Sequence, residues 1–134
     1  MLVDTHVHIG LNTDEPVEML LAQMQHNDVD KTLLVQRNPS TDNSYLIECK
    51  RRFAGRFSVV CRVDVASPDA LADAERWHRE GAEALRLKNF QRSPGSDPLA
   101  IWRKAQELGM PVSVGGLPEK YALPEFARIV EELP

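Results

Sequence analysis

The sequence has little of several features that mark particular classes of protein. It contains only two cysteines, Cys49 and Cys61, and no apolar N-terminal signal, so we expect reduced, buried thiols in a cytoplasmic protein. No apolar run approaches the ~18 residues that a membrane helix needs, so we expect no membrane partner. Sixteen lysines and arginines against twenty acidic residues give a net charge of −4, which argues against a nucleic-acid partner.

A nucleotide-binding signature is missing as well. No Gly-x-Gly-x-x-Gly motif follows the first predicted strand, which argues against a dinucleotide-binding Rossmann fold. The composition is ordinary, with 43% hydrophobic and 27% charged residues, as in globular domains generally. A chain of 134 residues is long enough for one domain with a real core.

Five short apolar segments alternate with amphipathic helical patterns along the chain. They begin near residues 2, 31, 57, 83 and 111, at intervals of 26 to 29 residues. This spacing is typical of successive βα units, in which right-handed crossovers make each strand parallel to the one before. A doubly wound open sheet and a (β/α) barrel both fit it.

Side-chain alternation within the predicted strands favours the barrel. A strand with helices on both faces is apolar throughout. Four of these strands instead carry polar residues on one face: Asp4, His6 and His8; Arg62 and Asp64; Arg86 and Lys88; and Ser113. A barrel has its helices outside and its site at the carboxyl ends of the strands. We therefore predict an α/β fold of the (β/α) TIM-barrel type.

The first predicted strand ends in His6-Val7-His8, the strongest candidate for chemistry in the chain. Side chains two residues apart on a strand project to the same face, so both imidazoles can bind one metal ion. The alternative interpretation is a pair of half-exposed histidines on an edge strand, because so short a motif also recurs by chance.

Four further polar residues lie at or near the carboxyl ends of predicted strands. Arg86 and Lys88 are predicted to bind a substrate carboxylate, or else to pair with Asp64 and other interior charges. Gln36 either contacts the substrate or simply begins a loop. Arg62 is interpreted as the ion-pair partner of Asp64, in the interior or at the rim.

Taken in order, the segments resemble the amidohydrolase-2 branch of the amidohydrolase superfamily. That branch contains metal-dependent hydrolases, sugar-lactone and pyrone lactonases, and non-oxidative aromatic decarboxylases, all on a distorted TIM barrel. The resemblance implies that His6 and His8 are metal ligands. It is carried by Val3-Asp-Thr-His-Val-His8, Gln36 with Asp42-Asn43, Arg56-Phe57 with Val63-Asp64, Gly81-Ala-Glu-Ala-Leu-Arg-Leu87, and Ile101-Trp102 with Gly109-Met-Pro111.

The resemblance also implies that part of the family's site is missing. The family adds a histidine on strand five, a histidine on or after strand six and an aspartate general base at the end of strand eight, whereas the fifth predicted strand here ends Ser113-Val-Gly-Gly116. An eight-stranded barrel needs roughly 250 residues. We therefore expect residues 1–134 to be the N-terminal part of a single (β/α)8-barrel domain, with about five of its eight βα units.

The function implied is an amidohydrolase-like hydrolase of a small carboxylated or sugar-derived lactone or ester. Its water would be activated by a divalent metal, zinc or manganese, on His6 and His8, or by active-site His and Asp groups without metal. One alternative is a non-oxidative decarboxylase of an aromatic or dienoic acid. Another is a non-catalytic truncated barrel that associates with itself or a partner, because five strands leave sheet edges and apolar faces open. On that ground we expect a homo-oligomer.

Overall fold

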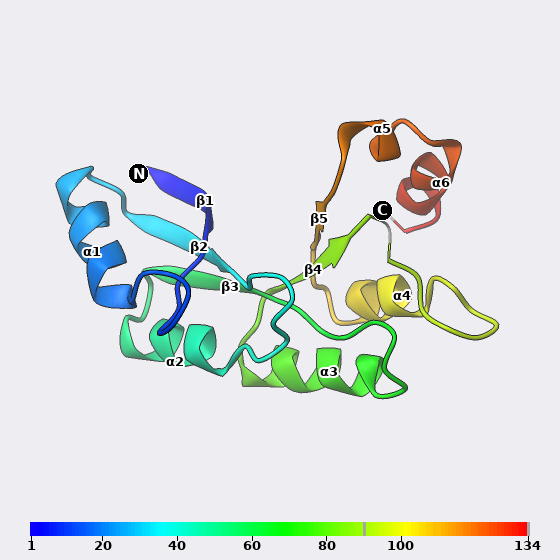
Figure 1. Cartoon of the computed structure of the whole chain (residues 1–134), viewed down its shortest axis with the longest axis horizontal. Coiled ribbons are helices and arrows are strands. Elements are labelled where there is room, and N and C mark those ends of the chain that lie inside the picture. Colours follow the sequence, from blue (N-terminus) through cyan, green and yellow to red (C-terminus); the bar gives the residue numbers. More distant parts are fainter. Residues whose placement is uncertain (90, 134) are drawn as a thin grey trace.

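Five parallel strands form one curled sheet in the order β1-β2-β3-β4-β5 (Figure 1). A computed structural model describes residues 1–89 and 91–133. Neighbours in the sheet are also neighbours in the chain, as in a (β/α) barrel and unlike a doubly wound sheet. The predicted fold class is therefore confirmed, with five βα units. The strands are β1 (Val3–Val7), β2 (Lys31–Val35), β3 (Phe57–Cys61), β4 (Ala84–Lys88) and β5 (Val112–Gly115).

Helices connect the strands or follow the last of them, and they lie outside the curled sheet (Figure 1). They are α1 (Val17–His26), α2 (Ser44–Arg52), α3 (Ala70–Glu80), α4 (Ala100–Glu107), α5 (Pro118–Tyr121) and α6 (Pro124–Glu132). The short α5 was not predicted from the sequence, because a single turn carries no measurable periodicity. Among the described residues, none of these helices has the length and apolar character to cross a membrane.

Ser67-Pro68 and Asp97-Pro98 precede the helices α3 and α4, but neither pair is part of its helix. The Ser67 hydroxyl accepts a hydrogen bond from the Asp69 amide at 3.1 Å, and the Asp97 carboxylate accepts one from the Leu99 amide, also at 3.1 Å. Each side chain thus closes a turn of its own before the helix. The helices α3 and α4 therefore start two residues after the prolines.

The core lies between the helices and the convex face. Its fully buried strand residues are Leu34, Val59, Cys61, Leu85 and Leu87. Full burial of each such Leu or Val contributes about 1.5–3 kcal/mol. Both cysteines are free and buried, as predicted, and burial raises the pKa of the Cys61 thiol to about 12.

The concave face is built from the alternate strand positions. Val35, Val60 and Arg62 are buried there, and Arg86 is half-buried. On the first strand the strict alternation predicted from the sequence is interrupted, because the β1–β2 register shifts between Asp4 and Val7. The Asp4 carboxylate accepts a hydrogen bond from the His6 amide at 3.0 Å in this irregular stretch.

Candidate active site

The two histidines lie together at the carboxyl end of β1. Their ring centroids are 5.0 Å apart with an interplanar angle of 87°, so one ring edge faces the other ring. The His8 Nδ1 atom lies 2.6 Å from the Val35 carbonyl oxygen of β2. A carbonyl oxygen only accepts, so Nδ1 carries the proton and a neutral His8 keeps its lone pair on Nε2.

The imidazole of His6 is held toward its neutral form. Burial by its neighbours lowers its pKa, and the positive charges of Arg86 and His8 lower it further, while Asp4 acts in the opposite direction. A neutral imidazole can accept a proton or bind a metal ion. His6 therefore favours the protonation state that either predicted role requires.

We expect the substitution Arg86→Gln to raise the pKa of His6, because it removes a positive charge that disfavours the imidazolium. An NMR titration of the His6 ring carbon–hydrogen signal measures this directly. Arg103→Gln, which removes an exposed arginine paired with Asp97, is the matched control and should leave the midpoint unchanged. If the titration midpoint of His6 is unchanged or lower in Arg86→Gln, the charge of Arg86 does not act on His6 as expected.

Arg86 extends from β4 across the concave face to the end of β2. Its Nη1 donates to the Gln36 carbonyl oxygen at 3.2 Å. Burial and then the charge of Arg37 lower the pKa of Arg86. Arg86 therefore joins the histidines in one site, whereas Lys88, two residues further along β4, is exposed and none of the contacts found connects its ammonium group to them.

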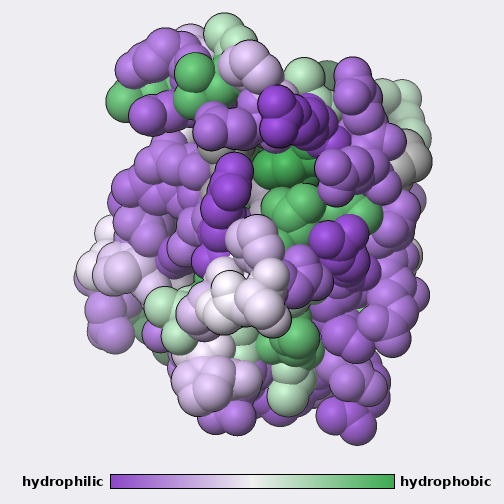
Figure 2. Space-filling model, turned by 90° about the vertical axis from the view of Figure 1, so that its right-hand side faces the viewer, coloured by the Kyte–Doolittle hydropathy of each residue, from purple (hydrophilic) through white to green (hydrophobic). Residues whose placement is uncertain are grey.

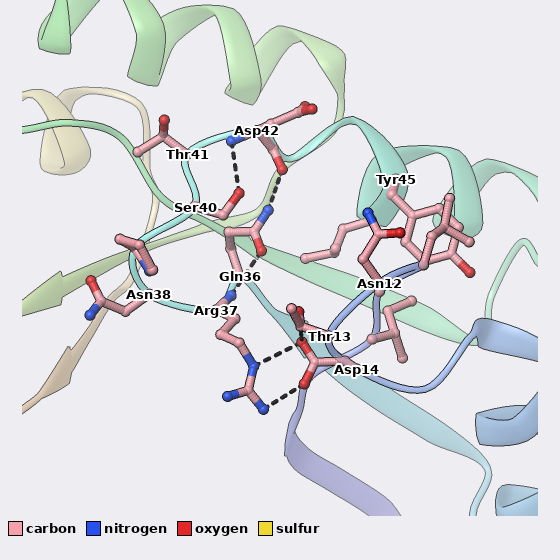
Figure 3. Close-up of a pocket in the computed structure, with 15 residues that line it drawn as sticks. Asn12, Thr13, Asp14, Gln36, Arg37, Asn38, Ser40, Thr41, Asp42 and Tyr45 are labelled. Carbon is pink, nitrogen blue, oxygen red and sulfur yellow. Dashed lines mark hydrogen bonds and ion pairs between the residues drawn. The ribbon is translucent and has the colours of Figure 1, made fainter.

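Gln36 is 6% exposed, and its side chain is engaged with the β2–α2 loop. Its Nε2 donates to the Asp42 carbonyl, and its Oε1 accepts from the Arg37 amide at 2.8 Å. Gln36 also lines a hollow of about 800 Å³ between the β1–α1 and β2–α2 loops (Figure 3). His6, His8, Arg86 and Lys88 do not line it.

Across this hollow the two loops are joined by an ion pair that sequence reasoning missed. Arg37 binds Asp14 through two bonds, Nη2 to Oδ1 at 2.5 Å and Nε to Oδ2 at 2.8 Å (Figure 3). Asp14 does not cap the nearby helix α1, because the residue before that helix is Pro16 and no side chain caps it. A pair separated by 23 positions leaves no local sequence signal.

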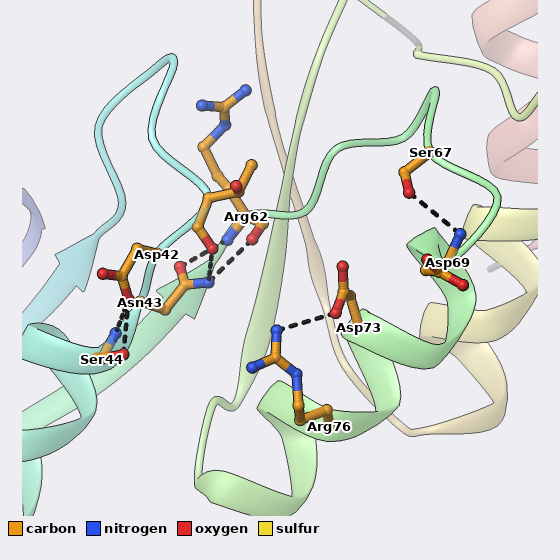
Figure 4. Close-up of polar contacts among 9 residues, drawn as sticks. Asp42, Asn43, Ser44, Arg62, Ser67, Asp69, Asp73 and Arg76 are labelled. Atoms are coloured by element: carbon orange, nitrogen blue, oxygen red, sulfur yellow. Dashed lines mark hydrogen bonds and ion pairs between the residues drawn. The ribbon is translucent and has the colours of Figure 1, made fainter.

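Asn43 fixes the β2–α2 loop to the end of β3 (Figure 4). It is fully buried, and its side chain exchanges two 2.9 Å hydrogen bonds with the backbone of Arg62 and donates a third to the Thr41 carbonyl at 2.9 Å. The prediction that Arg62 and Asp64 form an ion pair is wrong. The Asp64 carboxylate instead accepts from the Ala66 amide at 3.1 Å, and the Arg62 guanidinium donates to the Ser40 carbonyl at 3.1 Å.

The fit of a metal ion rests on the donors that converge at the histidines. His8 Nε2 and the neutral His6 ring have the chemistry of zinc or manganese ligands. The described residues bring together no third His, Cys, Asp or Glu with which the pair could hold an ion. A catalytic zinc site uses three protein ligands, so the described set is incomplete for one.

A family model described as amidohydrolase matches residues 3–134. The curled sheet also matches solved structures. One, described as a probable 2-pyrone-4,6-dicarboxylic acid hydrolase from Acinetobacter baumannii with citric acid bound, has a TM-score of 0.76 at 16% identity, covering 98% of this chain and 55% of that one. Another, an amidohydrolase from Burkholderia multivorans with bound HEPES, has a TM-score of 0.71 at 17% identity, with 98% and 53% covered.

The chain therefore belongs to the amidohydrolase family, as its sequence predicts. It spans about half the length of the solved structures that it matches. At these identities the structural likeness establishes the fold, a TIM-barrel architecture of which this chain has five strands. No curated protein matches the sequence.

Proposed function

We propose that this chain acts in an amidohydrolase-type enzyme that hydrolyses a small carboxylated or sugar-derived lactone or ester. The observation that carries the proposal is the convergence of His6, His8 and Arg86 at the carboxyl ends of β1 and β4. In barrels of this type, catalytic groups come from the carboxyl ends of different strands. Family membership supports hydrolysis as the reaction class.

Each of the three groups has a distinct part in this proposal. Arg86 binds a substrate carboxylate and so places the scissile carbonyl over β1. His8, with its proton fixed on Nδ1, presents the Nε2 lone pair to the reacting centre. His6, kept neutral by its surroundings, accepts the proton of the attacking water.

A divalent ion, zinc or manganese, would be held by His6 and His8 and would supply a hydroxide from bound water. The pair provides two ligands, so the steps above are assigned to the side chains alone. Gln36 and Lys88 are also proposed to bind substrate: Gln36 lines the hollow of Figure 3, and Lys88 lies on the same face of β4 as Arg86.

The substrate class follows from charge and from the solved relatives. Half-buried Arg86 and exposed Lys88 favour an anionic substrate. The Acinetobacter protein is described as acting on a pyrone with two carboxylates and holds citric acid. We therefore propose a carboxylated lactone as the substrate. We also propose that the protein acts in the cytoplasm.

A substrate screen tests the proposal. The full chain is incubated with carboxylated pyrones, sugar-acid lactones and their uncharged esters, while proton release is followed at constant pH. We expect opening of the carboxylated lactones, with one proton released per turnover and no CO2 in the product analysis. Preference for the uncharged compounds contradicts the role of Arg86, and CO2 release with an intact ring supports the alternative, a non-oxidative decarboxylase.

The second alternative is a non-catalytic barrel segment that associates with itself. Apolar surface supports it. Leu117 and Val130 are more than half exposed, and an apolar groove of about 220 Å³ lies between β5, α4 and α6. Figure 2 shows apolar side chains at the surface on this side of the molecule. The homo-oligomer stays a prediction, and an inactive chain in the screen would favour this alternative.

A further inference from the structure

Arg62 is a buried cation without a buried counter-charge. It directly follows β3, is only 6% exposed, and takes part in no ion pair within the described residues. Its Nη1 donates to two loop carbonyls, of Ser40 at 3.1 Å and of Arg37 at 3.5 Å. Burying a guanidinium is unfavourable unless an anion compensates it. Four other arginines do have carboxylate partners: Arg37, Arg52, Arg76 and Arg103.

A second guanidinium lies beside it. The β3–β4 register pairs Val60 with Ala84 and Cys61 with Leu85. One step further along both strands, Arg62 is the neighbour of Arg86, and side chains at paired positions point to the same face. The proximity has an electrostatic signature as well, because burial and then the charge of Arg86 lower the pKa of Arg62, while the charge of exposed Asp64 acts in the opposite direction.

The two guanidiniums keep the same edge free. Arg62 and Arg86 both use Nη1 for their hydrogen bonds to the protein, to the carbonyls of the consecutive residues Arg37 and Gln36. The contacts found among the described residues leave the Nε–Nη2 edge of each unbonded. That edge is the one that forms two parallel hydrogen bonds to a carboxylate.

The neighbouring strand leaves space at this edge. Gly115 ends β5, and a Cβ atom built on it would lie 3.6 Å from Nη2 and 3.8 Å from Nε of Arg86. Any side chain larger than a methyl group would fill the volume in front of the edge. Two like charges placed side by side, with no carboxylate hydrogen-bonded to either and with a glycine facing the free edge of Arg86, have the features of an anion site.

We propose that Arg62 and Arg86 together bind one carboxylate group of the substrate, in the space that Gly115 leaves open. Arg86 alone was assigned this role above. Arg62 is thus a specificity-determining residue that sequence reasoning took for half of an internal ion pair. The identity of the ligand as substrate rests on the proposed function, but the anion site itself does not.

Equilibrium binding to the full chain tests the site without any turnover. Glutarate is the probe, glutaramide is its uncharged counterpart, and inorganic phosphate is the competing anion. We expect saturable binding of glutarate, none of glutaramide, and weaker binding of phosphate. Loss of hydrogen bonds to a charged group should make Arg62→Gln bind glutarate about ten- to a hundredfold more weakly. Arg103→Gln, the surface control, should bind like the wild type.

Two further variants separate ligand binding from a structural role. Arg62→Gln is too short to keep the bond to the Ser40 carbonyl, so the salt dependence of glutarate binding separates the two roles: loss of a merely structural residue would leave it unchanged. We expect instead a shallower salt dependence and a milder loss in Arg62→Lys, which keeps the charge. Gly115→Val leaves both cations in place and should also abolish binding, which keeps the test open if Arg62→Gln fails to fold.

Unchanged glutarate binding in Arg62→Gln overturns the proposal. So does tighter binding of phosphate than of glutarate, or the absence of saturable binding to the wild type. These outcomes are distinct from failure of the proposed function. Glutarate binding without hydrolysis of any lactone refutes only the function, and hydrolysis with an unchanged KM in Arg62→Gln refutes only this inference.

Discussion

Replacing His8 by alanine is expected to lower kcat/KM for the lactone substrate by about 10²–10⁴-fold, the usual contribution of a side chain that transfers a proton. The reason is the fixed tautomer. Because Nδ1 lies 2.6 Å from the Val35 carbonyl oxygen, the ring is oriented and its neutral form has the lone pair on Nε2, and alanine supplies neither property. His6→Ala should cost a similar factor, since it removes the neutral ring next to Arg86.

Steady-state kinetics on the compound selected by the substrate screen measure both losses. His26→Ala is the matched control, because this histidine is exposed in the last turn of α1 and should leave the rate unchanged. Circular dichroism shows whether each variant is folded. Rates within about twofold of the wild type in both His6→Ala and His8→Ala contradict the assignment of the site to this pair.

Replacing Asn43 by alanine is expected to destabilise the fold by about 3 kcal/mol, since each buried group left unsatisfied costs about 1–3 kcal/mol. The variant loses three 2.9 Å hydrogen bonds and leaves the backbone amide and carbonyl of Arg62 without their partner. These groups lie in the interior, where water does not replace the lost bonds. The loop that carries Gln36 should loosen as well.

Urea unfolding followed by circular dichroism measures the change in free energy of unfolding. Asn27→Ala is the control, since that side chain is exposed and makes one 2.8 Å bond to the Gln23 carbonyl at the end of α1. It should change stability by less than about 0.5 kcal/mol. A loss equally small in Asn43→Ala would show that the loop is held by other contacts.

The carboxyl ends of the strands show how far sequence reasoning reaches. It predicted that His6, His8 and Arg86 lie at strand ends that face one site, because alternation along a strand predicts which residues share a face and a βα spacing predicts which strand ends meet. It did not foresee that the Gln36 amide bonds to the loop, or that Asp14 pairs with Arg37. Both contacts depend on how two loops fold back over the sheet, and residue spacing contains no information on that.

Arg62 shows most clearly which features the sequence predicts and which it does not. Its position on the concave face follows from alternation, but its partner does not. Asp64, two residues away, is the acidic residue nearest to Arg62 in the sequence. In the structure its carboxylate instead accepts a hydrogen bond from the Ala66 amide in its own loop. The parallel register of β3 and β4 decides instead that Arg62 stands beside Arg86.

The sequence by itself determined the family, the parallel βα order and the histidine pair, because these depend on periodicity and on residue type within single strands. Only the tertiary structure decided the shift in β1, the tautomer of His8, the Asn43 anchor and the pairing of two arginines. Each of these depends on the register of neighbouring strands or on loop closure, where residues far apart in the chain come within hydrogen-bonding distance.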